Sequence, residues 1–282
     1  MATKEKLRVD GLVLPGFSPL LADARKRFLD IENLPMRKDD VLLSSYPKLS
    51  NHWLNEIVPR LLNSMLHFDH RLIYTFLEFM PDLMDLQVMP SPRVMTSHLP
   101  YRCLPKEHIT NRGKIIRIIR NSKDVEVSAF HHFNIDPTVK DYVCPEWSEF
   151  LDDFLHRQIC YGRWFDIELE WEQAALVNPE NILTLYYKEL KTNGLQTIRC
   201  LADFLGIPNN SKFLQAVYEK GSFDEVQKRR MGTDDEYIYK KGMVDDWKSH
   251  ITVAQNEKID HVFNERMGDS KLRIRMNTSG KQ

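Results

Sequence analysis

A lysine among small polar residues separates an apolar run from an amphipathic stretch. Lys48 lies within Pro47-Lys48-Leu49-Ser50-Asn51-His52-Trp53, directly after the apolar run Val41–Tyr46. In a strand-to-helix loop, backbone N–H groups and the positive end of the helix dipole attract a phosphate, and a lysine adds a point charge. The loop is not a Walker A motif, because G-x-x-x-x-G-K-[ST] is absent. It predicts an anion-binding loop, with a solvated lysine in a turn as the alternative.

Two other predicted strands end next to residues that suit a nucleotide. Arg120 follows Lys114–Ile119, and its guanidinium together with the hydroxyl of Ser128 can hold a phosphate. Tyr187 follows Ile182–Tyr186 and offers a ring and a hydroxyl to a purine. Taken alone, an arginine such as Arg120 is more often a surface residue. A tyrosine such as Tyr187 lies at the edge of a core at least as often as in a binding site. Their shared place after strands favours a common site.

A histidine with the chemistry of a general base ends another short apolar run. His98 lies in SPRVMTSHLP, residues 91–100. An imidazole takes up and releases a proton near neutral pH, which suits it to activate a hydroxyl. A lone histidine is more often structural, so the sequence offers His98 only as a candidate base.

The elements that must position these residues alternate along the chain. Apolar runs predict buried parallel strands, and amphipathic segments predict the helices between them. The strands are expected at Val41–Tyr46, Lys114–Ile119 and Ile182–Tyr186. Helices are expected over Trp53–Leu66, with a kink or break at Pro59, and over Trp147–Tyr161. Another helix is expected to begin after its N-cap, which is Asn121 or Ser122. A fourth is expected over Leu195–Leu205 and ends before Gly206.

This order predicts an α/β fold, with one domain over residues 1–282 and a central parallel sheet flanked by helices. In such sheets, ligands bind beyond the carboxyl ends of the strands. All the candidate residues above would then lie at one edge of the sheet. The polar tail 276–282 is expected to be frayed.

The composition argues against several other classes of protein. With 39 Lys and Arg against 40 Asp and Glu, a general binder of nucleic acid or anionic membranes is not indicated. No stretch approaches the roughly 18 apolar residues of a membrane span, and residues 1–12 lack the apolar core of a secretory signal. The four cysteines form no CxxC pair, so neither a zinc site nor a disulfide framework is indicated. We therefore expect a cytoplasmic protein without a metal.

Five segments together resemble the cytosolic sulfotransferase family. The family's phosphosulfate loop YPKSGTTW is similar to YPKLSNHW (46–53), and its SPRxxKTHLP to SPRVMTSHLP (91–100). Its VxRNPKDVxVSYYHF is similar to IIRNSKDVEVSAFHHF (118–133), and its tyrosine-bearing strand to ILTLYYKEL (182–190). Its FRKGxxGDWK is similar to YKKGMVDDWK (239–248). The segments occur in family order and at family spacing, which makes chance agreement a poor explanation.

The resemblance implies a reaction and a role for each candidate residue. The donor would be PAPS (3′-phosphoadenosine 5′-phosphosulfate), bound in a P-loop-like turn without a metal, and PAP would be the product. Lys48 would bond the oxygen that bridges sulfate and phosphate, and His98 would take the acceptor's proton. Nucleotide contacts are implied for Ser50, Asn51 and His52 in the loop, for Trp53 and Tyr187 at adenine, for Arg120 and Ser128 at the 3′-phosphate, and for Ser222, Phe223, Lys240, Lys241 and Gly242. The acceptor would be a small phenol, alcohol, steroid or amine, in a pocket partly lined by residues 1–35.

Several positions depart from the family pattern, including Leu49, Ser50, Asn51 and His52 in the loop, Thr96, Ile167, Gly221 and Lys240. Ser50 replaces a glycine, which alters how closely the backbone approaches a phosphate. Thr96 replaces a lysine, and Lys240 replaces an arginine with its bidentate geometry. Two alternatives to an active sulfotransferase therefore stay open. One is a slow or silent relative that binds PAP or PAPS, and the other is a P-loop nucleotide or small-molecule kinase.

Residues Lys248–Glu257 predict a homodimer contact. Lys248, Thr252, Val253 and Glu257 fit the family's K-x-x-x-T-V-x-x-x-E dimer motif. Across a two-fold axis each lysine would face the opposite glutamate, with Val253 near the axis. The alternative is an ordinary helix start with Thr252 as its N-cap.

Overall fold

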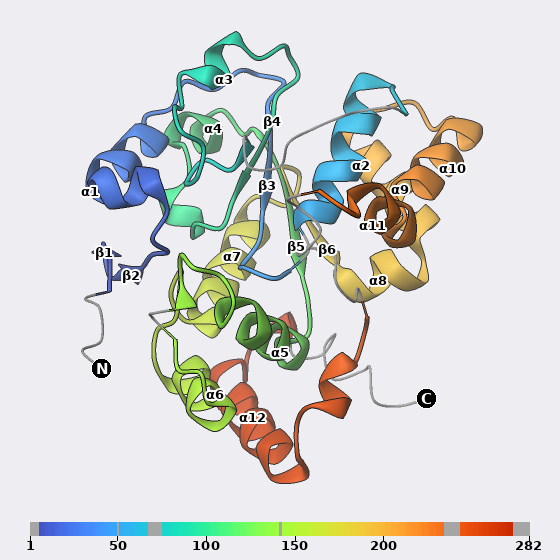
Figure 1. Ribbon diagram of the computed structural model, residues 1–282. Coiled ribbons are helices and arrows are strands. Elements are labelled where there is room, and N and C mark those ends of the chain that lie inside the picture. Colours follow the sequence, from blue (N-terminus) through green and yellow to red (C-terminus); the bar gives the residue numbers. More distant parts are fainter. Residues whose placement is uncertain (1–5, 50, 67–74, 141–142, 234–242, 273–282) are drawn as a thin grey trace.

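The computed structural model describes residues 6–49, 51–66, 75–140, 143–233 and 243–272. At the centre of these residues lies a four-stranded parallel sheet in the order β4-β3-β5-β6 (Figure 1). The strands are β3 (Val41–Ser44), β4 (Val94–Ser97), β5 (Lys114–Ile119) and β6 (Ile182–Tyr186). All four run in the same direction, so their carboxyl ends share one edge. The predicted α/β fold with a central parallel sheet is confirmed.

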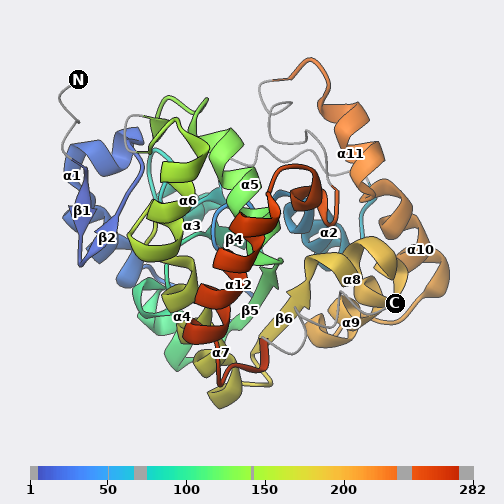
Figure 2. The same ribbon diagram turned by 90° about the horizontal axis from the view of Figure 1, so that it is seen from below.

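Helices cover both faces of the sheet, which is why its strands are apolar without alternation. One side carries α2 (Asn51–Asn63), α8 (Tyr187–Thr192), α9 (Gly194–Leu205), α10 (Ser211–Lys220) and α11 (Phe223–Arg230) (Figure 1). The other side carries α1 (Ser18–Glu32), α4 (Lys106–Thr110) and α7 (Trp164–Val177). Beyond the carboxyl ends of the strands lie α5 (Ser122–Phe133), α6 (Trp147–His156) and α12 (Val253–Arg266) (Figure 2).

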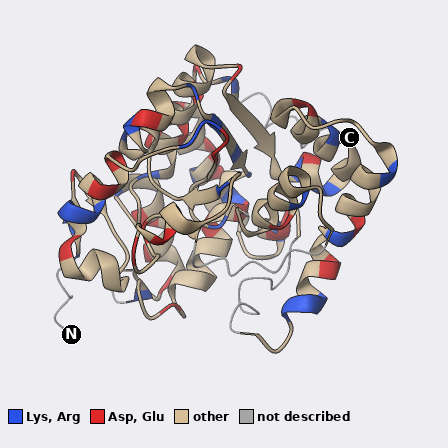
Figure 3. Ribbon diagram, turned by 90° about the horizontal axis from the view of Figure 1, so that it is seen from above, with Lys and Arg blue, Asp and Glu red and all other residues tan. Residues whose placement is uncertain are grey.

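Short elements complete the described chain. They are the pair β1 (Arg8–Val9) and β2 (Leu12–Val13), the helix α3 (Asp85–Val88) and the 3-10 turns η2 (Tyr101–Cys103) and η5 (Asp246–Ser249). Basic and acidic residues are interspersed along the ribbon, as the near-zero net charge leads one to expect (Figure 3). Within the described ranges, none of the helices combines the length and the apolar character that crossing a bilayer requires.

Several predicted boundaries are confirmed. β5 and β6 have the predicted bounds, and Asn121 is the N-cap of α5, because its side chain accepts the N–H of Lys123 at 3.0 Å. α9 begins one residue before the predicted start and ends at Leu205, where Gly206 adopts a left-handed φ of 75°. Such a backbone favours glycine, so the sequence signal for this end is local.

Other predicted boundaries are wrong. β3 ends at Ser44 and does not include Tyr46, whose hydroxyl donates to the carbonyl of Gly162 at 3.1 Å. α6 ends at His156 and does not reach Tyr161, whose N–H donates to the carbonyl of Val13 at 2.7 Å. α2 ends at Asn63 and not at Leu66, and it continues through Pro59, which therefore does not end the helix.

Candidate active site

The loop between β3 and α2 carries Lys48. Lys48 is half-buried and adopts a φ of 69°, a left-handed backbone that residues with side chains rarely adopt. Asn51, the first residue of the 13-residue helix α2, is 1% exposed. Neither Oδ1 nor Nδ2 of Asn51 has a hydrogen-bonding partner among the described residues. Buried amides are normally paired, so this one fits a ligand that supplies hydrogen-bonding groups. Ser50, also predicted here, lies outside the described residues.

Aromatic rings from three segments meet beside α2. The indole N–H of Trp53 donates to the carbonyl of Gly221, and its ring meets that of Tyr187 edge-to-face at 6.0 Å. The Lys191 ammonium lies 5.4 Å from the centroid of the Trp53 ring and 4.5 Å from that of Phe223. A cation over aromatic faces is attracted to them, which helps to hold these rings together. Lys191 was not among the predicted site residues, because only its place one turn after Tyr187 distinguishes it in the sequence.

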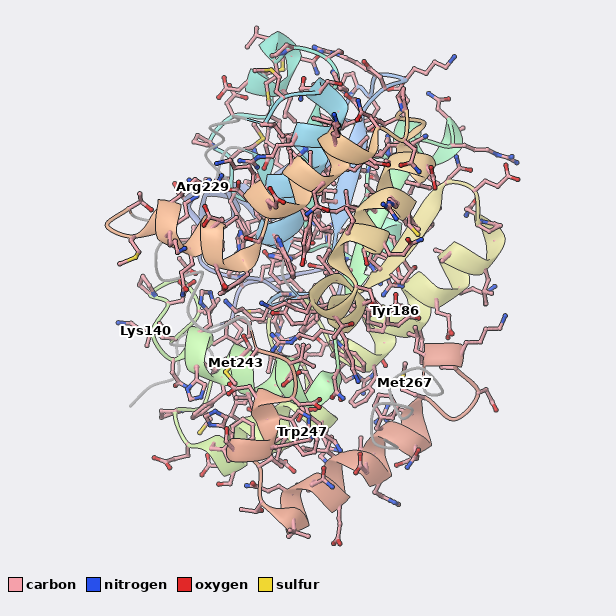
Figure 4. The ribbon with its side chains drawn as sticks, turned by 90° about the vertical axis from the view of Figure 1, so that its right-hand side faces the viewer. Lys140, Tyr186, Arg229, Met243, Trp247 and Met267 are labelled. Atoms are coloured by element: carbon pink, nitrogen blue, oxygen red, sulfur yellow. The ribbon has the colours of Figure 1, made fainter. Side chains whose placement is uncertain are left out.

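Ser222 and Phe223 begin α11 at the edge of this ring cluster. The Ser222 hydroxyl accepts the N–H of Glu225 at 3.4 Å and so caps the helix. At the other end of α11, where Figure 4 labels Arg229, this arginine donates to Glu56 at 3.0 Å. Arg230 donates to the same carboxylate at 2.7 Å. Because Glu56 belongs to α2, these bonds hold α11 against the helix that follows the Lys48 loop.

Arg120 lies at the carboxyl end of β5. Its guanidinium lies 4.6 Å from the centroid of the Tyr187 ring, and Nη2 donates to the carbonyl of Met243 at 2.8 Å. Met243 directly follows Lys240, Lys241 and Gly242, which lie outside the described residues. Ser128 is half-buried, two turns into α5. The two residues predicted to hold one phosphate are thus carried by consecutive elements.

His98 directly follows β4, and its ring orientation is set by a carbonyl. Nδ1 lies 2.8 Å from the backbone oxygen of Ser45. Since a carbonyl only accepts, Nδ1 carries the proton and Nε2 keeps a free lone pair. Burial, together with the charge of Lys48, lowers the pKa of His98 to about 4. The imidazole is therefore neutral at physiological pH and can accept a proton at Nε2.

Aromatic side chains surround His98. The rings of Phe76, Tyr161 and Phe79 lie 4.9, 5.5 and 6.1 Å from the imidazole, centroid to centroid. Phe17 stacks on Phe79 at 3.9 Å. It belongs to the N-terminal segment 1–35, so that segment reaches the surroundings of the histidine. An apolar acceptor would find a matching environment here.

The structure shows the surroundings of two residues that depart from the family pattern, His52 and Thr96. The ring of His52 lies 5.8 Å from that of Phe76, and burial, with the charge of Lys48, lowers the pKa of His52 well below its usual value. Thr96 is fully buried and donates to Oδ1 of Asn55 on α2 at 3.0 Å. Thr96 thus connects β4 with α2 and adds no charge beside His98.

Each strand of the sheet is therefore followed by a candidate residue. Lys48 comes after β3, His98 after β4, Arg120 after β5 and Tyr187 after β6. Because the strands are parallel, these four residues lie at one edge, as predicted. In the part of the chain that the structure describes, no group of three or more His, Cys, Asp or Glu side chains is arranged to hold a metal ion.

Comparison with known proteins identifies the family. The model of the sulfotransferase domain matches residues 38–271. The chain belongs to the sulfotransferase family. This confirms the family that the five sequence motifs predicted.

Relatives and solved structures agree with this family. This sulfotransferase is 30% identical over 265 residues to mouse sulfotransferase 6B1, covering 90% of the chain and 84% of that relative. It is 30% identical over 278 residues to bovine sulfotransferase 1A1, covering 91% and 93% of the two chains. A crystal structure of mouse sulfotransferase SULT7A1 complexed with PAP superposes with a TM-score of 0.81 at 28% identity, covering 96% of this chain and 97% of that one.

The site of this sulfotransferase fits a phosphorylated nucleotide. The buried amide of Asn51 without partners lies at the start of α2, where the helix dipole attracts a phosphate. Trp53, Tyr187 and Phe223 supply aromatic faces for a base. Arg120 supplies a cation that also contacts the carbonyl of Met243. These residues thus offer aromatic faces to a base, and polar or cationic groups to anionic groups at the start of α2 and after β5.

Proposed function

We propose that Lys48 and His98 carry out the sulfuryl transfer of this enzyme, from PAPS to a small acceptor with PAP as the product. The observation that carries this assignment is the bond from His98 Nδ1 to the carbonyl of Ser45 at 2.8 Å. It leaves Nε2 as a neutral base next to the loop that bears Lys48. The related mouse enzyme that binds PAP supports the choice of donor.

The chain's own groups have complementary tasks in this reaction. PAPS supplies the activated sulfuryl group. His98 Nε2 takes the proton from the acceptor's hydroxyl or amine, which makes the acceptor atom nucleophilic. The Lys48 ammonium and the N-terminus of α2 stabilise the negative charge that develops on the departing phosphate oxygen. Asn51 and His52 would assist in the same loop, and Ser50 is proposed there from sequence alone.

The remaining predicted residues would hold the nucleotide. Trp53, Tyr187 and Phe223 would contact adenine, with Ser222 beside them. Arg120 and Ser128 would bind the 3′-phosphate, together with Lys240, Lys241 and Gly242. Support comes from the position of Arg120, which contacts Met243 immediately after those residues. A fixed cation at each phosphate accounts for the anion binding without a metal.

The acceptor is proposed to be a small, largely apolar molecule with a hydroxyl or amine. Phe76, Phe79 and Tyr161 around His98 support this class.

We also propose a cytoplasmic location, which fractionation of cells expressing the tagged protein can test. A homodimer through Lys248–Glu257 is proposed as well. Val253 in this segment is 76% exposed and would be covered by a second copy, while Thr252 caps α12 as the alternative interpretation expected.

His98→Asn is the sharpest test of the catalytic assignment. The asparagine amide can still donate to the Ser45 carbonyl, but it cannot accept a proton as a base. Turnover with PAPS should fall by about 10²–10⁴-fold, while calorimetric PAP affinity stays unchanged. The acceptors screened should include phenols, catecholamines, steroids and aliphatic alcohols, with a metal chelator present. A variant that keeps most of its rate contradicts the assignment, and a wild type that binds PAP without any turnover identifies a silent relative.

A further inference from the structure

Glu78 is a fully buried carboxyl group directly beside His98. The segment that carries it runs alongside β4, with Phe76 bridged to Thr96 and the N–H of Leu77 donating to the Thr96 carbonyl at 2.9 Å. Glu78 is 0% exposed, and its Oε1 accepts the backbone N–H of His98 at 2.6 Å. Oε2 has no hydrogen-bonding partner among the described residues. A carboxyl group in this position needs a reason beyond packing, because burying it costs free energy.

Helix α1 holds the Glu78 segment in place. Arg27 is buried, and its Nε donates to the carbonyl of Leu77 at 2.9 Å while Nη2 donates to that of Met80 at 2.5 Å. These bonds fix the backbone on both sides of Glu78. The carboxyl group is therefore presented to His98 from a rigid support, although it comes from a distant part of the sequence.

Two hydrogen bonds then determine the position of the histidine. The Ser45 carbonyl accepts from the ring at Nδ1, and Glu78 accepts from the backbone N–H of His98. The first sets the ring's rotation and tautomer, and the second sets where the main chain lies. With both ends held, Nε2 keeps one direction relative to the Lys48 loop. A base that is fixed in this way loses little orientational freedom when it meets the acceptor.

We propose that Glu78 is a positioning residue for His98, which holds the histidine backbone and stabilises the imidazolium that forms when Nε2 accepts the acceptor's proton. The proposal rests on the proposed function, since it requires His98 to be the base. The proton moves from the acceptor to Nε2, and an ionised Glu78 stays a carboxylate during this step. The carboxylate accepts the backbone N–H of the same residue at 2.6 Å, so its negative charge acts on the imidazolium through a buried, poorly screened environment.

The proposal predicts a characteristic pH dependence. Burial raises the pKa of Glu78 to about 7, against the opposing effects of the His98 N–H, the Ser97 hydroxyl and Arg27. Among the residues that the structure describes, the charged or titratable groups facing Glu78 are Arg27 from α1, His98 after β4, and Tyr161 from the segment before α7. Below this pKa Glu78 is neutral and the stabilisation is absent, and above it the carboxylate is present. The turnover rate should therefore rise near pH 7, well above the pKa of about 4 of His98 itself.

Glu78→Gln tests this, because glutamine keeps an oxygen for the His98 N–H and removes the charge. At pH 8 the kcat should fall about tenfold, with KM and PAP affinity changed by less than about twofold. At pH 5.5 the variant and the wild type should have similar rates, so the rise near pH 7 disappears. The matched control is Glu126→Gln, another buried glutamate with a raised pKa, on α5. That control should keep the rise, and a Glu78→Gln profile parallel to the wild type overturns the proposal.

A second measurement works without turnover. In the PAP complex, the ¹⁵N shift of His98 Nε2 in the wild type should show an inflection near pH 7 as Glu78 ionises, and Glu78→Gln should lack it. If the variant does not fold, the wild-type titration alone decides, because a flat Nε2 shift between pH 6 and 8 overturns the proposal. If no acceptor is ever sulfonated, the proposed function fails while the titration still tests the coupling between Glu78 and His98.

Discussion

The carboxylate of Asp124, a residue of α5, lies 3.6 Å from the guanidinium Nε of Arg120. Asp124 follows Arg120 by four residues in the chain. The same carboxylate accepts the N–H of Asp245 at 3.1 Å and that of Trp247 at 3.2 Å. In Figure 4, Met243 and Trp247 lie beside α5. One buried aspartate thus connects the arginine proposed to bind the 3′-phosphate with the segment that follows Lys240–Gly242.

Asp124→Asn should weaken PAP binding about tenfold, because an amide has one accepting oxygen and no charge for Arg120. AMP, which lacks the 3′-phosphate, should lose less. Calorimetric titration of both nucleotides measures this. The exposed Asp203→Asn on α9 is the control and should bind both nucleotides as the wild type does. Equal losses for PAP and AMP would show that Asp124 has a general structural role.

Arg120→Ala should weaken PAP binding by a few kcal/mol, through the loss of a charge-assisted contact to a phosphate. Arg120→Lys should recover only part of it, since an ammonium cannot reproduce the fork or the stacking on Tyr187. The same titrations apply, with the exposed Arg157→Ala as control. If AMP affinity fell as much as PAP affinity, Arg120 would not belong to the 3′-phosphate site.

Glu126→Gln should make the protein more stable at alkaline pH. Glu126 is 0% exposed, neither oxygen has a partner among the described residues, and burial raises its pKa to about 8 despite the nearby Lys123. Because the folded pKa exceeds the unfolded one, the folded state prefers the protonated form. That contribution is complete below the unfolded pKa of about 4.3 and is lost as the pH rises through 8.

Denaturant unfolding at pH 5 and pH 9 checks this prediction. At pH 9 the variant's free energy of unfolding should exceed that of the wild type by about 2–5 kcal/mol, and at pH 5 the difference should be much smaller. The exposed Glu265→Gln on α12 is the control. A pH dependence that is the same in wild type and Glu126→Gln would contradict the prediction.

Val253→Glu should convert the proposed homodimer into a monomer that still binds PAP. Two glutamates facing each other across a two-fold axis repel, and the apolar contact is lost. The contact would be small, below the roughly 1,200 Å² of a standard interface, so dissociation on dilution is expected. Light scattering at micromolar concentration gives the mass. A wild-type mass near 33.3 kDa, instead of about twice that value, rules out the dimer.

The sequence alone determined the elements whose signals are local. The bounds of β5 and β6 follow from apolar runs, the start of α5 from an Asn121 side chain that caps its own helix, and the end of α9 from Gly206. It also determined the candidate residues after each strand, because parallel strands bring their carboxyl ends to one edge. A periodic pattern or a cap needs only neighbours in the chain, so such features can be predicted without the fold.

The tertiary structure decided what depends on partners far away in the sequence. Tyr161 lies outside α6 and donates its N–H to Val13, and Tyr46 lies outside β3 and donates its hydroxyl to the carbonyl of Gly162. Glu78 reaches His98 because Leu77 bonds Thr96 of β4 and Arg27 of α1 binds the carbonyl of Leu77. Hydrogen bonds between distant segments leave no periodic trace in the sequence. Their energies are nonetheless large enough to end an element or to position a base.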